Sequence, residues 1–117
     1  MKRYILEDET MLVETNDERY EEYVVTKKET GVSPDEIWNL DESIAIFILP
    51  RLIKFKELTV GYPTHLKDMN EWHSILDTMI DAFTIICEDN YNTSEEDEKI
   101  IEQGLENFKE YFRQLWW

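Results

Sequence analysis

The segment NEWHSILDTMIDAFTIICED, Asn70 to Asp89, constrains the fold more than any other part of the sequence. Its apolar residues follow the i, i+3, i+4, i+7 spacing without a gap. They are Trp72, Ile75, Leu76, Met79, Ile80, Phe83, Ile86 and Cys87. Residues at this spacing share one side of an α-helix, so the segment predicts an amphipathic helix over 70–88, capped by Asn70, with one long buried face.

Other segments carry helix start signals. Ser33, Pro34 and Glu36 have the spacing of a capping box with proline at the first helical position, which predicts a helix over 34–39. Asp41 is expected to cap the next helix, over 41–58. Ser94 and Asp97 repeat the cap spacing before a helix over 95–115. Four helices therefore follow one another from residue 34 onward.

The last of these helices has its own apolar stripe, formed by Ile101, Leu105, Phe108, Phe112 and Leu115. Trp116 is expected to continue that stripe, and Trp117 to point to the other side. Gly104 lies on the apolar side, where the missing side chain would let another helix come close.

The N-terminal segment has weaker signals. Residues 1–16 mix short apolar runs with acids in a pattern compatible with a short β-hairpin, although no turn dipeptide supports it. A short helix is expected after Asn16 or Asp17 as a cap, with Gly31 as its end.

Pro50 stands inside the most apolar helix. Apolar residues lie on both of its sides, so the helix is expected to be central: Ile44, Ile48, Leu52 and Phe55 on one, and Ile46, Leu49 and Ile53 on the other. Proline lacks the N–H that would bond to the carbonyl of Ile46 and crowds that turn, at a cost of about 3 kcal/mol. We expect a kink that serves packing. The alternative is a freed Ile46 carbonyl that binds a ligand.

These signals predict a mainly α fold, a small helical bundle with a kinked central helix. With 117 residues, a single domain over 1–117 is expected, in which 1–32 form a variable N-terminal segment and 33–117 the helical core. Cys87 is the only cysteine, which excludes an internal disulfide and fits a reducing compartment. No signal peptide pattern and no membrane-spanning run is visible, so an intracellular protein is expected.

The charge is strongly acidic. The chain has 27 Asp and Glu against 12 Lys and Arg, a net charge of −15, and no Lys or Arg stands between Asp68 and Glu98. Such a field repels nucleic acid and attracts basic protein surfaces; the alternative is a surface that only keeps the protein in solution. The residues predicted to contact a basic partner are Asp77, Asp81, Glu88, Asp89, Glu95, Glu96, Asp97, Glu98 and Trp117.

Metal and cysteine chemistry are not favoured by the sequence. His73 and Asp77 are four residues apart and could face one ion, but with His65 in a loop they make an incomplete zinc site. Cys87 lies on the apolar stripe and is expected to be a small core residue.

Carboxylate pairs allow a further hypothesis. Asp41 and Glu42 on one helix, with Asp77 and Asp81 on another, imitate the Mg²⁺ sites of all-helical nucleotide pyrophosphohydrolases. The doubled Glu-x-x-Glu spacing of those enzymes is absent. No phosphate-binding loop or nucleophile motif occurs either, so we expect no catalytic residue, metal or cofactor.

Four stretches together resemble a group of small proteins of tailed bacteriophages: DEIWNLDESIAIFILPRLIKFKE, GYP, EWHSILDTMIDAF and IIEQGLENFKEYFRQLWW. The resemblance covers Ser33 to Trp117. It implies a phage origin and a helical domain in which Trp38, Pro50 and Trp72 are architectural, with no activity or catalytic residue to carry over.

The expected function is therefore non-enzymatic. A phage-encoded acidic protein of this kind would bind and inhibit a host protein with a basic nucleic-acid-binding surface by DNA mimicry, as an anti-CRISPR-like or other counter-defence protein does, in the host cytoplasm. It would not bind nucleic acid itself. The alternatives are a helical oligomeric phage accessory protein, such as a homodimer joined through Trp117, and the Mg²⁺-dependent nucleotide hydrolase.

Overall fold

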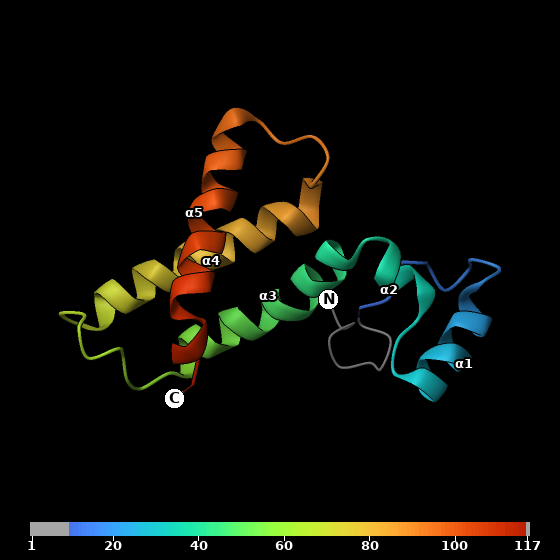
Figure 1. Ribbon diagram of the computed structural model, residues 1–117, viewed down its shortest axis with the longest axis horizontal. Coiled ribbons are helices and arrows are strands. Elements are labelled where there is room, and N and C mark those ends of the chain that lie inside the picture. The colour runs from blue at the N-terminus through green and yellow to red at the C-terminus, as the bar shows by residue number, and fades with distance from the viewer. Residues whose placement is uncertain (1–9, 117) are drawn as a thin grey trace. The chain divides into compact units, whose positions relative to one another are not determined.

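The computed structural model describes residues 10–116, apart from the side chain of Asp89. In this range the chain forms five α-helices, a short 3-10 turn and no strand, which confirms the mainly α fold (Figure 1). The elements are α1 (Tyr20–Thr30), α2 (Pro34–Trp38), α3 (Leu40–Leu58), α4 (Met69–Asp89), α5 (Glu95–Tyr111) and the 3-10 turn η2 (Phe112–Gln114).

The chain packs as two compact units, one ending at Phe47 and the other beginning at Ile48. The division falls inside α3 and not at residue 32, where the variable segment was expected to end. The hairpin expected over 1–16 lies largely outside the described residues. Its described part, 10–16, holds turns and no strand.

Two of the predicted helix caps are confirmed. Glu36 accepts a hydrogen bond from the backbone N–H of Ser33 at 2.8 Å, and Pro34 occupies the first helical position. Ser94 and Asp97 form the second capping box, with the Asp97 N–H donating to Ser94 Oγ at 3.1 Å. Gly31 ends α1 with a φ of 89°, a left-handed conformation that favours glycine.

The other predicted caps are wrong by two or three residues. Asp41 lies inside the first turn of α3, because the carbonyl of Asn39 already accepts the N–H of Ser43 at 3.1 Å. Asp68 caps α4 in place of Asn70, since its side chain accepts the N–H of Glu71 at 2.9 Å. Arg19 precedes α1 without a side-chain cap bond, so neither Asn16 nor Asp17 is the cap.

Pro50 lies inside α3, which continues to Leu58 as one helix. Leu52 is buried, as expected of a packed helix. The expectation that both sides are covered is wrong at Ile44 and Ile53, whose exposed fractions are 49% and 41%. The bend at Pro50 stays a prediction.

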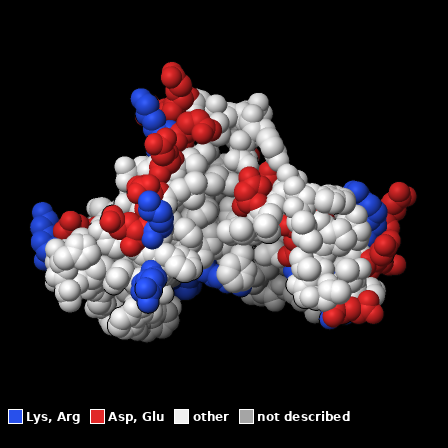
Figure 2. Space-filling model, viewed as in Figure 1, with Lys and Arg blue, Asp and Glu red and all other residues white. Residues whose placement is uncertain are grey.

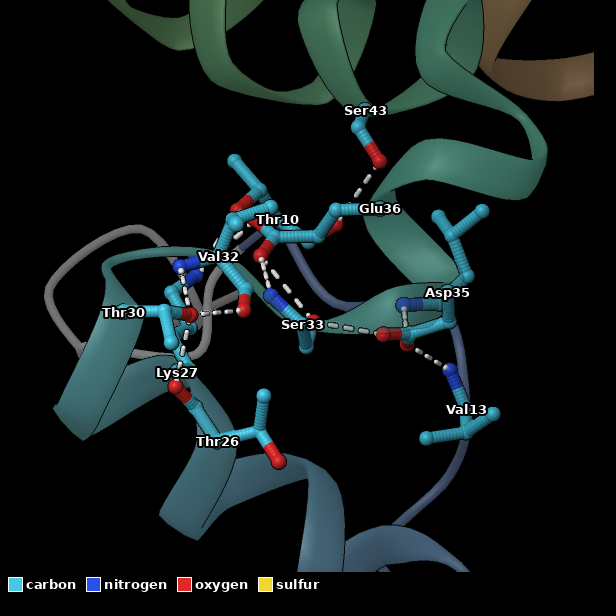
Figure 3. A network of polar contacts seen from close by, with 11 residues as sticks. Thr10, Val13, Thr26, Lys27, Thr30, Val32, Ser33, Asp35, Glu36 and Ser43 are labelled. Carbon is cyan, nitrogen blue, oxygen red and sulfur yellow. Dashed lines mark hydrogen bonds and ion pairs between the residues drawn. The ribbon is translucent and has the colours of Figure 1, made fainter.

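The first unit is organised around buried polar side chains (Figure 3). Asp35 is fully buried and accepts the backbone N–H groups of Leu12 and Val13 at 2.6 and 2.9 Å. The Ser33 hydroxyl donates to Asp35 at 2.5 Å. Since Asp35 is on α2, these bonds fasten the segment before α1 to that helix.

A second carboxylate completes this network. Glu36 forms an ion pair with Lys27 of α1 at 2.9 Å and accepts the Thr10 hydroxyl. The carbonyl of Thr10 in turn accepts the hydroxyl of Ser43, at 3.1 Å (Figure 3). The N-terminal segment, α1, α2 and the start of α3 are therefore joined by polar contacts.

The second unit has an apolar core on α4. Trp72, Leu76, Met79 and Phe83 are buried, as the stripe predicts. The C-terminal half of α3 packs against α4, where the rings of Phe55 and Trp72 meet edge to face with centroids 6.4 Å apart.

The helix α5 crosses α4 (Figure 1), and Gly104 lies against α4. A Cβ atom at Gly104 would collide with the Cβ of Ala82 and the backbone oxygen of Thr78. The predicted close approach of another helix to Gly104 is therefore confirmed. Phe108 extends this contact through an edge-to-face pair with Phe83, at a centroid distance of 5.2 Å.

The apolar stripe of α5 is less complete than expected, because Leu105 is 41% exposed, and it also ends earlier. The α-helix stops at Tyr111, and η2 turns the following residues away from the wheel positions of an α-helix. Trp116 is 73% exposed and Phe112 is 59% exposed, so the expectation that Trp116 continues the core stripe is wrong. Trp117 lies outside the described residues.

Candidate protein-binding surface

The densest acidic region is the segment Glu88–Glu98, here called the acidic turn, which joins α4 to α5. It contains Glu88, Asp89, Glu95, Glu96, Asp97 and Glu98, and no Lys or Arg. Glu88, Glu95, Glu96 and Glu98 are exposed. Carboxylates without interspersed bases produce a negative potential that a basic surface can meet.

Part of the acidic turn has a structural role. Asp97 accepts the Ser94 N–H at 3.2 Å within the capping box, and Glu98 accepts the hydroxyl of Thr93. Acids in the first turn of α5 also interact favourably with the positive end of its helix dipole. Folding alone therefore accounts for acids at positions 95–98.

The same explanation fails at the end of α4. Glu88 lies in the last turn of α4, where the helix dipole is negative, and this turn holds no basic residue. A carboxylate there costs about 0.3–1 kcal/mol when it has no compensating partner. Departures from local preference are expected at functional sites, so Glu88 is the member of the acidic turn that most needs a functional explanation.

The remaining predicted contact residues differ in their surroundings. Asp77 is paired with Lys56 of α3 at 2.7 Å, with half of its side chain exposed. Asp81 is exposed. The side chain of Asp89 and all of Trp117 are outside the described part of the chain. Asp81 and Glu88 are therefore exposed to solvent, whereas Asp77 also belongs to a contact between helices.

A second row of acids, not among the predicted contact residues, lies on α5. Glu102, Glu106 and Glu110 are exposed and share one side of the helix, at i, i+4 and i+8. Figure 2 shows acidic side chains along α5, interrupted by a few basic ones. Lys109 pairs with Glu106 at 3.2 Å. The i+4 repeat was the signal in the sequence that could have identified this row.

The second unit also carries an open groove at its C-terminal end, here called the aromatic groove. It has a volume of about 270 Å³, and its walls include Val60, Tyr62, Pro63, Trp72, Gln114 and Trp116. Trp72 is buried, whereas Tyr62 and Val60 are 42% and 81% exposed. The GYP and LWW stretches supply half of these residues, but only the folded chain brings them together.

One side of the Trp72 ring is covered by Tyr111, with centroids 5.6 Å apart. The Tyr111 ring stacks on His65 at 5.8 Å, and its hydroxyl lies 3.3 Å from His65 Nε2. Burial, together with the negative charges of Glu110 and Glu71, raises the pKa of Tyr111 above its ordinary value. Tyr111 is therefore a neutral aromatic support beside two carboxylates.

The histidines and acids considered for metal binding are not gathered into one site. No group of three or more His, Cys, Asp or Glu is placed to hold a metal ion within residues 10–116. Cys87 is partly exposed, so the expectation that it is a core residue is wrong.

Comparison of the chain with protein-family models, curated proteins and solved structures found no match. The resemblance to phage proteins therefore stays a prediction. None of the helices between residues 10 and 116 has both the length and the apolar character that crossing a bilayer demands.

Proposed function

We propose that this chain is a non-enzymatic binding protein whose acidic turn docks on a basic, nucleic-acid-binding surface of another protein. Glu88 carries the proposal, because an exposed carboxylate at the C-terminal end of α4 opposes the helix dipole and gains nothing for the fold. Opposite charges on the two surfaces would accelerate association.

The α5 row supports the proposal less strongly. Carboxylates four residues apart are spaced by about 6 Å along the helix axis. A DNA strand carries one phosphate per roughly 3.4 Å of axis. The row of Glu102, Glu106 and Glu110 is therefore sparser than a DNA strand, and Lys109 dilutes it further. The acidic turn supplies the density that this row lacks.

Occupying such a surface would deny the partner its nucleic acid. A phage-encoded protein that does this is an inhibitor of host function, such as an anti-CRISPR-like counter-defence protein. The partner class is accordingly a host protein that binds nucleic acid, and the site is the acidic turn with Asp81 as a neighbouring contact.

The test is a charge reversal with opposite effects on stability and binding. Glu88→Lys places a cation at the negative end of α4, so the free energy of unfolding should rise by about 0.3–1 kcal/mol. Capture of basic proteins from a bacterial lysate should fall, and proteins captured by the parent should be displaced by added DNA. Denaturant unfolding and quantitative mass spectrometry measure the two effects.

The matched control is Glu21→Lys, at an exposed acid in the first turn of α1. Reversal at that end of a helix should lower stability and leave capture unchanged. If Glu88→Lys captures the same DNA-displaceable proteins as the parent, the acidic turn is only a solvated surface. Capture that persists in high salt and depends on exposed apolar residues would favour the oligomeric accessory protein instead.

A further inference from the structure

The aromatic groove carries two exposed rings that lie outside the apolar core. Trp116 and Tyr62 form its exposed walls, with exposed fractions of 73% and 42%, above the buried Trp72. Exposed Trp and Tyr beside a hollow are typical of anchor positions in protein interfaces. The groove therefore has the features of a pocket for one side chain of a partner.

The lining of the groove narrows the chemistry of that side chain. None of its described lining residues is charged, and Gln114 supplies an amide. The apolar walls at Val60 and Pro63 suit an aliphatic stem. The exposed rings of Trp116 and Tyr62 can attract a cation at the end of that stem, and the net charge of −15 favours a cationic partner over an anionic one.

Arginine meets these requirements better than lysine. Its guanidinium is planar, more weakly hydrated than an ammonium group, and stacks on aromatic faces, whereas lysine is a compact and strongly hydrated charge. The first unit contains a contact of this kind, between a guanidinium and two aromatic rings. The Cζ of Arg19 lies 5.1 Å from the ring centroid of Trp38 and 5.8 Å from that of Tyr23, and Asp17 pairs with the guanidinium at 2.8 Å.

We propose that the aromatic groove receives an arginine side chain of the partner, with the guanidinium stacked on Trp116 and the stem against Val60 and Pro63. This inference rests on the proposed function in that the partner surface is basic. The acidic turn would supply long-range attraction that does not distinguish Arg from Lys, and the groove would supply the preference for arginine.

Two labelled octapeptides of equal charge separate these contributions, one alternating glycine with arginine and the other alternating glycine with lysine. Fluorescence anisotropy with the full chain at low salt should give a Kd for the arginine peptide that is lower by about threefold or more. Trp116→Ala should bring the ratio of the two Kd values to one, and Trp116→Phe should keep part of it. Tyr62→Ala should also reduce it.

Val25→Ala is the control, because Val25 is 55% exposed on α1 in the other unit. It should leave the ratio unchanged, and unchanged melting temperatures should show that all variants are folded. Equal affinities in the parent, or a preference that survives Trp116→Ala, would overturn the proposal. Equally good binding of an uncharged glycine–leucine peptide would overturn it too, since the groove would then be a general apolar site.

The two proposals fail in different ways. Glu88→Lys should weaken both basic peptides by the same factor and keep their ratio. A constant ratio with no loss of affinity in Glu88→Lys would contradict the acidic turn and leave the groove proposal standing. Loss of affinity without any preference for arginine would contradict the groove alone.

Discussion

Asp35 shows how one buried acid can fix the position of a chain segment. Burial by itself would raise its pKa, but hydrogen bonds from the Ser33 hydroxyl and from the backbone N–H groups of Val13 and Leu12 outweigh burial and hold the pKa below its ordinary value. The ionised form is therefore the form that the fold stabilises. No spacing in the sequence indicates this role, because the backbone partners Leu12 and Val13 are more than twenty residues away.

The depressed pKa of Asp35 sets the sign of a pH dependence. The folded protein binds fewer protons at this site than the unfolded chain, so its contribution to stability is present above the ordinary value of 3.8 and is lost as the pH falls through the lower folded pKa. Asp35→Asn should reduce the free energy of unfolding at pH 7 by about 2 kcal/mol and weaken the loss of stability in acid. Denaturant unfolding between pH 2.5 and 7 measures both, at roughly half-unit steps.

Glu29→Gln is the matched control, since Glu29 is an exposed acid on α1 in the same unit. It should keep both the stability and the acid profile of the parent. An unchanged profile in Asp35→Asn would mean that the buried carboxylate is not the group whose protonation destabilises this unit.

At the scale of elements, the sequence predicted the helices better than their ends. The capping boxes at Ser33 and Ser94 involve local contacts, so the spacing of cap and third helical residue was sufficient. Asp41 and Asn70 failed because each helix begins earlier: the Asn39 carbonyl already accepts the Ser43 N–H, and the Asp68 side chain accepts the Glu71 N–H. The helical wheel for α5 failed at Leu105, which is 41% exposed, and again after Tyr111, where a 3-10 turn changes the direction of the side chains.

Gly104 gives a prediction at this scale. In a free helix, Gly→Ala would stabilise by about 1 kcal/mol. Here the added Cβ meets Ala82 and the backbone oxygen of Thr78, and a backbone atom cannot move aside by changing rotamer. Gly104→Ala should therefore lower the free energy of unfolding by about 1–3 kcal/mol, as overpacking does. Denaturant unfolding followed by far-UV circular dichroism measures it.

Gly61→Ala is the comparison, because a Cβ there meets no atom within 4 Å. Gly61→Ala should be neutral or slightly stabilising, because alanine lowers the conformational entropy of the unfolded chain. If both substitutions stabilise the protein, α5 does not approach α4 at Gly104 as closely as the structure has it.

For the whole molecule, the sequence indicated the net charge and the helical class, but it revealed only one of the two candidate binding surfaces. The acidic turn is continuous in sequence and could be read directly. The aromatic groove could not, because Tyr62 and Pro63, Trp72 and Trp116 come from three separate segments. The division inside α3 was also hidden, since an unbroken helical pattern passes through it.

The net charge of −15 predicts that salt raises the stability of the protein and slows its association with a cationic peptide. Excess like charge destabilises the compact state by self-repulsion, and salt screens this repulsion as the Debye length falls from about 20 Å at 20 mM to about 6 Å at 300 mM. Raising the salt over this range should therefore increase the melting temperature by several degrees. The association rate with the glycine–lysine peptide should fall severalfold, because the attraction between the acidic turn and the cations is screened by the same ions. Thermal circular dichroism and stopped-flow anisotropy measure the two responses, and an uncharged glycine–serine peptide should bind at neither salt concentration. A melting temperature that falls with salt would mean that ion pairs such as Lys27–Glu36 and Lys56–Asp77 contribute more to stability than the repulsion removes.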